Sequence, residues 1–208
     1  MTLDLKKELK HLYKPSTKTV SVVEVPPMNY LMINGEGNPN TSQQYKQAIS
    51  TLYALAYGIR AICKVEDKTF TVMPLEGLWW WHENPEEVRP LNSSDKDQFL
   101  WTMMILQPDF VTADMVEAAR KTVHKKKKNP PYLDDIRFDT YHENLAVQIM
   151  HVGSYDDEAP TIKKLHEYIV EQGYKFAKKH HEIYLSNPDR VSSDKLKTII
   201  RQPFVTTS

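Results

Sequence analysis

The chain has 208 residues, 40% of them hydrophobic, and its 27 basic and 27 acidic residues give a formal net charge of zero. This length fits one substantial domain or two small modules that share a core, and the balanced charge excludes a general attraction to nucleic acid or anionic membranes. The single cysteine, Cys63, excludes an intramolecular disulfide and a cysteine-rich zinc site, so we expect a reducing, cytoplasmic environment.

The N-terminal stretch MTLDLKKELKHLYK is charged throughout and lacks the apolar core of a signal peptide. Leu5, Leu9 and Leu12 instead predict a short amphipathic helix. Elsewhere charged residues interrupt the apolar stretches every few positions, so we expect no membrane-spanning segment.

The next elements form a strand-rich first half. Residues 17–25 and 28–35 predict two strands, separated by a pair of prolines that cannot donate to a ladder. Helical spacing from Thr41 to Lys64 predicts a long helix, with Thr41 or Ser42 as its N-cap. Two more strands are expected at TFTVMPLEGLWWW and FLWTMMILQP, joined by the polar loop ENPEEVRPLNSSD.

The second half begins after a helix predicted from Thr112 to the lysine run at 125–128, where Asn129-Pro130-Pro131 stops it. The stretch IRFDTYHENLAVQIMHVG alternates like a pair of strands that turn near Glu143-Asn144. The remaining elements are a helix marked by Ile162, Leu165 and Ile169 that ends at Gly173, and strands at HHEIYL and KLKTIIRQP.

The element order repeats, which indicates an internal duplication. Each half runs strand, glycine turn, helix, strand, strand, with Gly35 and Gly153 after the first strands and MILQP and IIRQP at the ends. The pseudo-repeats span approximately 17–110 and 135–204, with a helical connector at approximately 112–128. The predicted fold class is α+β: one domain over 1–208 in which tandem β-α-β-β modules with antiparallel sheets surround a central ligand groove.

Within HHEIYL, alternation places His180, Glu182 and Tyr184 on one side of the strand. A glutamate in a strand that faces water would be salt-bridged to Lys178 or Lys179 at a sheet edge. A glutamate that faces the groove would be buried and chemically useful. In such an aromatic cleft we expect burial to raise the carboxyl pKa of Glu182 toward neutrality, as suits a general base.

Several stretches together resemble the GyrI-like small-molecule-binding proteins. In the second half these are HVGSY, EQGY, HHEIYLSNP and KLKTIIRQPF; in the first half VMPLEGLWWW, MMILQPDFVT and KKKKNPP are similar to a free-standing subgroup of that family. The resemblance implies the GyrI-like fold. Some members of the subgroup are cyclopropanoid cyclopropyl hydrolases, which open the strained ring of DNA-alkylating natural products, so it also implies a cofactor-independent hydrolase in drug resistance or detoxification.

On this resemblance Glu182 is expected to be a general base that faces the groove. Tyr155 follows the turn after IMHVG, and its phenol is expected to orient a water molecule or a ligand carbonyl, or else to pack beside the helix start. The family pattern commonly has proline where this chain has Ser154. The alternative function is binding or sequestration of aromatic drugs, cationic ones included, which a carboxylate among aromatic rings also suits.

Aromatic residues supply the candidate walls of the groove. Alternation sends Trp79 and Trp81 to one side of their strand and Trp80 to the other, so at least one of the three is expected in the core. Stacking on indole favours a flat polycyclic ligand. The candidate ligand-binding residues are Trp79, Trp80, Trp81, Trp101, Tyr141, His151 and Tyr184.

No metal site or cofactor is predicted. His180 and His181 are adjacent on a strand and point to opposite faces, so one ion cannot take both. The sequence also has no glycine-rich phosphate loop, nucleophile elbow or dinucleotide fingerprint.

The expected partner is a hydrophobic aromatic small molecule, with neither nucleic acid nor membrane as a partner. The lysine run at 125–128 is interpreted as a solvated helix end that complements the macrodipole. No stretch is left over for a DNA-binding helix-turn-helix, and no surface patch indicates inhibition of a partner such as gyrase. The sequence assigns no oligomeric state.

Overall fold

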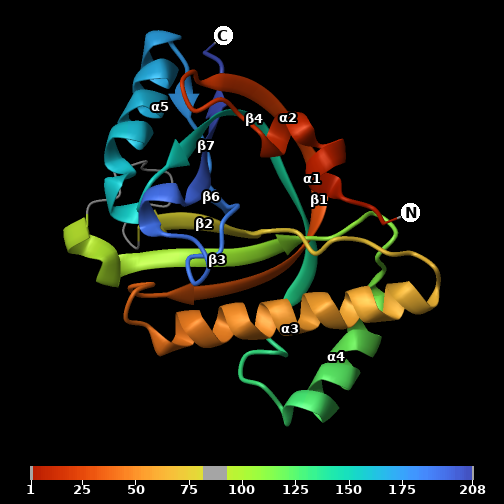
Figure 1. Ribbon diagram of the computed structural model, residues 1–208. Coiled ribbons are helices and arrows are strands. Elements are labelled where there is room, and N and C mark those ends of the chain that lie inside the picture. Colours follow the sequence, from red (N-terminus) through yellow and green to blue (C-terminus); the bar gives the residue numbers. More distant parts are fainter. Residues whose placement is uncertain (1, 82–92, 208) are drawn as a thin grey trace.

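Six antiparallel strands close into a barrel in the computed structural model, which describes residues 2–81 and 93–207 (Figure 1). The strand order is β4-β1-β3-β2-β6-β7, and pairing between β4 and β7 closes the ring. A short further strand, β5, pairs with β7. The strands are β1 (Ser21–Glu36), β2 (Leu75–Trp81), β3 (Phe99–Leu106), β4 (Arg137–Val152), β5 (Lys175–Phe176), β6 (His180–Tyr184) and β7 (Lys197–Val205).

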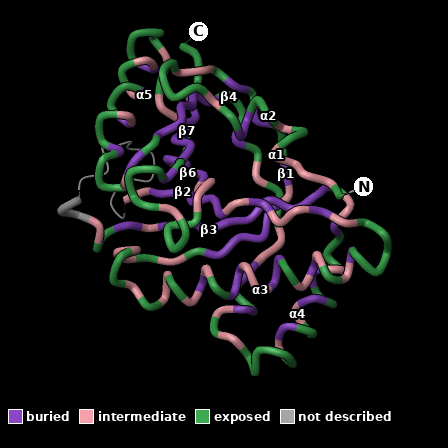
Figure 2. Tube along the Cα trace, in the orientation of Figure 1, coloured by how far each residue is buried: buried purple, intermediate pink, exposed green. Residues whose placement is uncertain are grey.

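Helices cover the outside of this barrel. Helix α3 packs on β1 and β3, α4 packs on α3, and α5 packs on β4 and β7, so α5 lies away from the α3–α4 pair (Figure 1). The helices are α1 (Leu5–Glu8), α2 (Lys10–Tyr13), α3 (Gln43–Val65), α4 (Ala113–Lys127) and α5 (Ala159–Glu171), with 3-10 turns η1 (Ser93–Gln98), η2 (Tyr155–Asp157) and η3 (Ser193–Lys195). The buried positions gather along the strands and on the inner sides of these helices (Figure 2).

The α+β class is as predicted, but β1 is longer than expected. Residues 17–25 and 28–35 were predicted as separate strands, whereas β1 runs unbroken from Ser21 to Glu36 through both prolines. The prolines are tolerated because this half of β1 pairs only with β4, and pairing with β3 starts at Tyr30. Gly35 therefore lies inside the strand, and the positive φ of 91° belongs to Gly37.

Strand β4 is also continuous, so the turn predicted at Glu143-Asn144 is wrong. Its 16 residues pair with β1 over most of their length and with β7 near the end. Asn144 has a φ of 70°, which is the left-handed conformation that asparagine tolerates, and the strand continues past it. The sequence signal for a turn marks a local distortion within one long strand.

Helix α3 begins where the sequence predicted it. The Ser42 side chain accepts a hydrogen bond from the Tyr45 amide at 3.2 Å, as an N-cap does. By length and composition α3 is apolar enough to cross a membrane, which differs from the expectation above. Here its apolar side is buried against β1, β3 and α4, as in the core helix of a globular domain.

The interior of the barrel contains a buried ionic network. His181 donates to Glu143 at 2.9 Å and to Glu76 at 3.0 Å, and Arg201 donates to Glu143 at 3.0 Å. Burial by itself lowers the pKa of His181, but the two carboxylates raise it to about 9. Burial alone would raise the pKa of Glu143, whereas His181 and Arg201 lower it to about 2. Two carboxylates thus face two cations, which keeps each buried charge paired.

The N-terminal helix α2 joins this network at one end of the barrel. Tyr13 donates to Glu76 at 2.6 Å, and the carbonyl of Leu12 accepts from Arg201 at 2.9 Å. The carbonyl of His11 accepts from Gln148 at 2.8 Å. Residues that precede the barrel in the sequence therefore complete the hydrogen bonding inside it.

Candidate functional site

Glu182 lies on the outer face of β6, opposite to the interior network. It pairs in register with Gly77 on β2 and with Ile200 on β7, while its neighbour His181 points into the barrel. The glutamate is 7% exposed. The alternation of HHEIYL is as predicted, and it separates a structural histidine from a candidate catalytic carboxylate.

A chain of hydrogen bonds fixes the Glu182 carboxylate. His180 Nε2 donates to Oε1 at 3.2 Å, and the Tyr184 hydroxyl donates to Oε2 at 2.8 Å. Trp79 Nε1 in turn donates to the Tyr184 hydroxyl at 2.9 Å. Four residues from β2 and β6 thus form one polar unit in which both carboxylate oxygens have a partner.

In the described part of the chain, neither Lys178 nor Lys179 makes the alternative salt bridge to Glu182. Lys178 donates to the backbone carbonyls of His142 and Glu143, and the Lys179 ammonium lies 3.1 Å from the centroid of the Trp80 ring. Both lysines are therefore engaged elsewhere.

The predicted rise in the pKa of Glu182 is wrong. Burial does raise the pKa of this carboxyl, but the hydrogen bond and charge of His180, followed by the hydrogen bonds of Tyr184 and Glu158, lower it below its ordinary value. Glu182 is consequently ionised at neutral pH and is held in the form that accepts a proton.

A second buried carboxyl, Glu158, was missed by the sequence analysis. It is the N-cap residue of α5, is 4% exposed, and lies close enough to Glu182 for the two carboxyls to share a hydrogen bond. Burial first, and then the negative charge of Glu182, raise the pKa of Glu158 to about 10. The site therefore contains a second buried carboxyl close to the ionised Glu182.

Tyr155 and Tyr45 complete the ring of groups around the carboxyl pair. Tyr155, in η2, is 39% exposed and makes an edge contact with Tyr184 at 5.8 Å between ring centroids. Burial, Glu158 and Glu182 raise the pKa of Tyr155 to about 12. Tyr45 comes from the first turn of α3, and burial followed by Glu182 raises the pKa of its phenol. Both phenols therefore keep their protons at neutral pH and can donate.

His151 supports this site from outside. Its ring nitrogens lie 3.0 Å from Thr161 Oγ1 and 3.1 Å from the carbonyl of Ser154. The histidine thereby links the end of β4 to α5 and holds the turn that leads into Tyr155. Its predicted contact with a ligand stays a prediction.

Gly77 makes room for the hydrogen-bonded unit. A Cβ atom at this position would lie 2.7 Å from Trp79 Nε1 and 3.1 Å from the Tyr184 hydroxyl. Only glycine lets the indole and the phenol meet over the strand beside Glu182. The sequence alone gives no signal for this residue, because its role depends on strand register.

The structure separates the predicted aromatic residues. Trp79 and Tyr184 belong to the Glu182 site, whereas Trp80 lies on the opposite face under Lys179. Trp101 is fully buried against Gly35 and Tyr45, and Trp81 packs on Phe99. Tyr141 lies near Glu143 and Lys178, away from Glu182. Ligand contacts by Trp80, Trp81, Trp101 and Tyr141 stay predictions.

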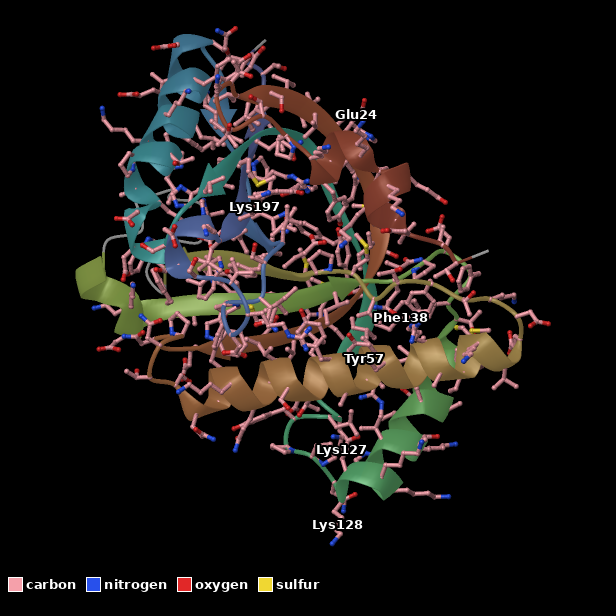
Figure 3. The ribbon with its side chains drawn as sticks, in the orientation of Figure 1. Glu24, Tyr57, Lys127, Lys128, Phe138 and Lys197 are labelled. Atoms are coloured by element: carbon pink, nitrogen blue, oxygen red, sulfur yellow. The ribbon has the colours of Figure 1, made fainter. Side chains whose placement is uncertain are left out.

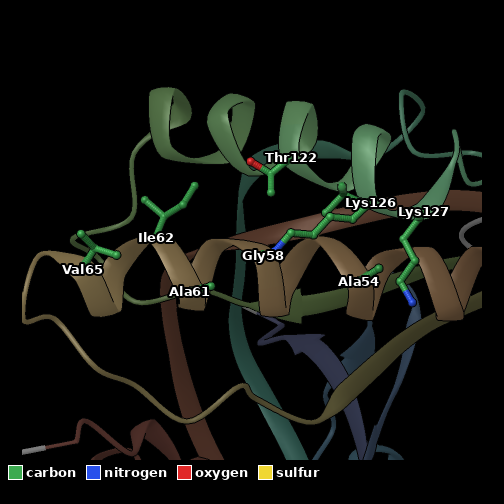
Figure 4. A pocket seen from close by; sticks show the side chains of 9 residues that line it. Ala54, Gly58, Ala61, Ile62, Val65, Thr122, Lys126 and Lys127 are labelled. Atoms are coloured by element: carbon green, nitrogen blue, oxygen red, sulfur yellow. The ribbon is translucent and has the colours of Figure 1, made fainter.

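Two further features lie away from this site. An open pocket of about 310 Å³ lies between α3 and α4, lined by small and apolar residues such as Ala54, Gly58 and Ile62, with Lys126 at its rim (Figure 4). The lysines at the end of α4 are exposed; Lys128 extends away from the barrel (Figure 3), whereas Lys126 and Lys127 point toward α3 (Figure 4). Within residues 2–81 and 93–207, no three His, Cys, Asp or Glu side chains gather to hold a metal.

This fold and site define a small-molecule-binding domain built on an antiparallel barrel. Residues 18–204 match the profile of the GyrI-like small molecule binding domain, and the chain belongs to this family. The family resemblance drawn from the sequence is thereby confirmed.

Solved structures support the same assignment. An uncharacterised conserved protein from Listeria innocua shares 35% identity with a TM-score of 0.89, covering 98% of this chain and 100% of that one. A protein described as a hydrolase, also from Listeria innocua, shares 35% identity with a TM-score of 0.84 over the same shares. The EcmrR C-terminal domain, at 14% identity and a TM-score of 0.56 over 91% of this chain and 98% of that one, shares the fold. A comparison with curated proteins gives no match.

Proposed function

We propose that this protein is a cofactor-independent hydrolase that opens the cyclopropane ring of cyclopropanoid DNA-alkylating agents. The observation that carries the proposal is Glu182: a buried, ionised carboxylate with both oxygens hydrogen-bonded, among aromatic side chains. The similarity to a Listeria protein described as a hydrolase supports the reaction class.

The reaction needs little beyond a placed water and a base. As Glu182 takes a proton from water, the water oxygen bonds to the cyclopropane methylene carbon and the strained carbon–carbon bond breaks. The electron pair of that bond moves into the conjugated ring, whose carbonyl oxygen becomes a phenolate and takes up a proton. General-base catalysis of this kind contributes typically 10²–10⁴-fold, which suits so reactive a substrate.

The neighbouring side chains fit this role for Glu182. Tyr155 is partly exposed and protonated, so its hydroxyl is available to orient the water or the substrate carbonyl. Trp79 and Tyr184 hold the carboxylate in one orientation through their hydrogen bonds. The wall that binds a flat polycyclic substrate would include the partly exposed rings of Tyr155 and Tyr184.

Hydrolysis is tested by following the ring-opened phenol by mass spectrometry in water enriched in oxygen-18. Wild-type protein and Glu182→Gln are each incubated with a cyclopropanoid alkylator, and ligand affinity is measured in parallel. We expect label incorporation above the spontaneous rate with wild type alone, and similar affinity for both proteins. Tight binding without enzymatic label incorporation by the wild type would contradict the hydrolase function for that substrate.

The second candidate function is binding of aromatic cations without turnover. The observation that favours it is the same carboxylate, since Glu182 lies near Tyr45, Tyr155 and Tyr184, and a carboxylate among aromatic rings attracts organic cations. This function predicts stronger binding of a cationic aromatic dye than of its neutral isostere, with no product formed. The two functions separate in the labelling experiment.

A further inference from the structure

We propose that Glu158 and Glu182 hold one proton between them, that this proton resides on Glu158, and that Glu158 thereby acts as a positioning residue for the ionised Glu182. In its effect on turnover this inference rests on the proposed function, whereas the shared proton is a property of the free protein.

The burial of both carboxyls favours a shared proton. Glu158 is 4% and Glu182 is 7% exposed. Glu158 directly follows the turn η2, whose Tyr155 ring lies 5.8 Å from the ring of Tyr184, and the Tyr184 hydroxyl donates to Glu182. This arrangement brings the two buried carboxyls together. Two carboxylates have no donor between them, and buried like charges in contact repel strongly. One proton converts the repulsion into a charge-assisted hydrogen bond, and the pair then carries one negative charge.

Hydrogen-bond partners decide which carboxyl holds the proton. Glu182 already accepts from His180 and Tyr184, which stabilise its charge. Glu158 Oε1 is buried and has no hydrogen-bond partner among the described residues. Its position at the N-terminus of α5 favours a negative charge only weakly, and this effect is small beside the cost of burying a second charge there.

The other titratable groups around the pair do not alter this assignment. From η1, Lys96 favours an ionised Glu158, but its ammonium is paired to Asp156 at 2.9 Å. From α3 and η2, Tyr45 and Tyr155 keep their protons, because burial and the nearby carboxylates raise the pKa of each phenol. From α5, His166 faces His180, and burial followed by His180 lowers the pKa of His166 to about 4, so it is neutral.

A protonated Glu158 does for Glu182 what a fixed amide would do. It donates one hydrogen bond to the carboxylate, keeps a second negative charge out of the site, and holds the base in one orientation. Glutamine at position 158 imitates this state permanently, since its amide donates and never ionises. Alanine removes the donor. The pair Glu158→Gln and Glu158→Ala therefore separates the hydrogen bond from the carboxyl itself.

The shared proton is tested on the free protein by ¹³C NMR of the glutamate carboxyl carbons between pH 5 and pH 10. We expect one protonated buried glutamate at neutral pH in the wild type, absent in Glu158→Gln. In Glu182→Gln the Glu158 signal should titrate at lower pH, because the neighbouring charge is gone. Glu167→Gln, an exposed position on the same helix, should match the wild type. If every carboxyl is ionised at neutral pH in the wild type, the inference is wrong.

The positioning role is tested by ring-opening rates between pH 7 and pH 9.5. Losing a hydrogen bond to a charged group predicts a rate for Glu158→Ala about 10- to 100-fold below the wild type, with glutamine restoring most of the rate. The ring-opening rate of the wild type should fall toward pH 9.5, as Glu158 begins to lose its proton. The rate of Glu158→Gln should show no such fall, because glutamine does not ionise. A Glu158→Gln rate as low as that of Glu158→Ala, with both folded, would refute the positioning role. If no variant and no wild type turns over, the proposed function fails, and the NMR result still decides the shared proton.

Discussion

The pH dependence of stability gives a quantitative test of the two buried protons in this structure. His181 has its pKa raised to about 9 by Glu143 and Glu76 against burial, and Glu158 has its pKa raised to about 10 by burial and Glu182. In the unfolded chain a histidine titrates near 6.5 and a glutamate near 4.3. Between pH 7 and pH 8 the native state therefore binds about two protons that the unfolded state has released.

The sign of the effect follows from this difference in protons bound. For His181 the stabilisation is complete below pH 6.5 and is lost as the pH rises through about 9. Glu158 keeps its proton in the native state and loses it on unfolding, so it lowers the stability of the fold progressively as the pH rises toward about 10. Each extra native proton lowers the free energy of unfolding by about 1.4 kcal/mol per pH unit, so the two together lower it by about 2.5 kcal/mol from pH 7 to pH 8. Lys179, whose pKa burial lowers to about 8, loses a native proton in the same range and offsets a few tenths of a kcal/mol of this change.

The assay is urea unfolding followed by far-UV circular dichroism at pH 7, 7.5 and 8, for the wild type, Glu158→Gln and the control Glu167→Gln. Replacing Glu158 removes one of the two protons. In that variant alone, the fall in the free energy of unfolding with pH should therefore decrease to about 1.4 kcal/mol per pH unit. A wild-type slope near zero, or an unchanged slope in Glu158→Gln, would refute the reasoning.

Three substitutions test the packing and hydrogen bonding of the fold by urea unfolding. Gly77→Ala should lower the free energy of unfolding by about 1–3 kcal/mol and disturb the fluorescence of Trp79, because the new methyl group overlaps its indole nitrogen. Arg201→Met should cost about 3–5 kcal/mol, because it leaves Glu143 buried with one cation fewer. Ser42→Ala should cost about 0.5–2 kcal/mol, because it removes the N-cap bond of α3.

A variant whose free energy of unfolding lies within about 0.5 kcal/mol of the wild type, the range of ordinary surface substitutions, would contradict the prediction for that substitution. A change of fluorescence in Gly77→Ala without a loss of stability would mean that the indole moves at little cost.

Local chemistry made much of the fold predictable. Ser42 caps α3, as one of the two predicted candidates, and Thr112, where the next helix was predicted to begin, caps α4. The predicted strand break at the prolines of β1 and the predicted turn at Asn144 are wrong, because pairing within the sheet keeps both strands continuous. Pairing on one side tolerates the prolines of β1, and Asn144 supplies a left-handed conformation inside β4.

The candidate site was only half visible in the sequence. The alternation of HHEIYL places His180 and Tyr184 beside Glu182, so the two strand neighbours that lower its pKa can be identified from the sequence. Glu158 was not, because a glutamate at a helix start ordinarily complements the macrodipole, and only the tertiary fold brings it to Glu182. Gly77 was hidden for the same reason, since strand register alone sets what lies across from it.

The contacts of α2 show which N-terminal residues a folded fragment of this protein needs. The family match begins at residue 18, yet Arg201 and Gln148 find acceptors on Leu12 and His11, and Tyr13 reaches Glu76. Expression from residue 18 would keep every strand but remove α2. The buried guanidinium of Arg201 and the buried carboxylate of Glu76 would then each lose a hydrogen bond. Fragment boundaries for biochemical work should therefore follow the hydrogen bonds of the barrel rather than the limits of the family match.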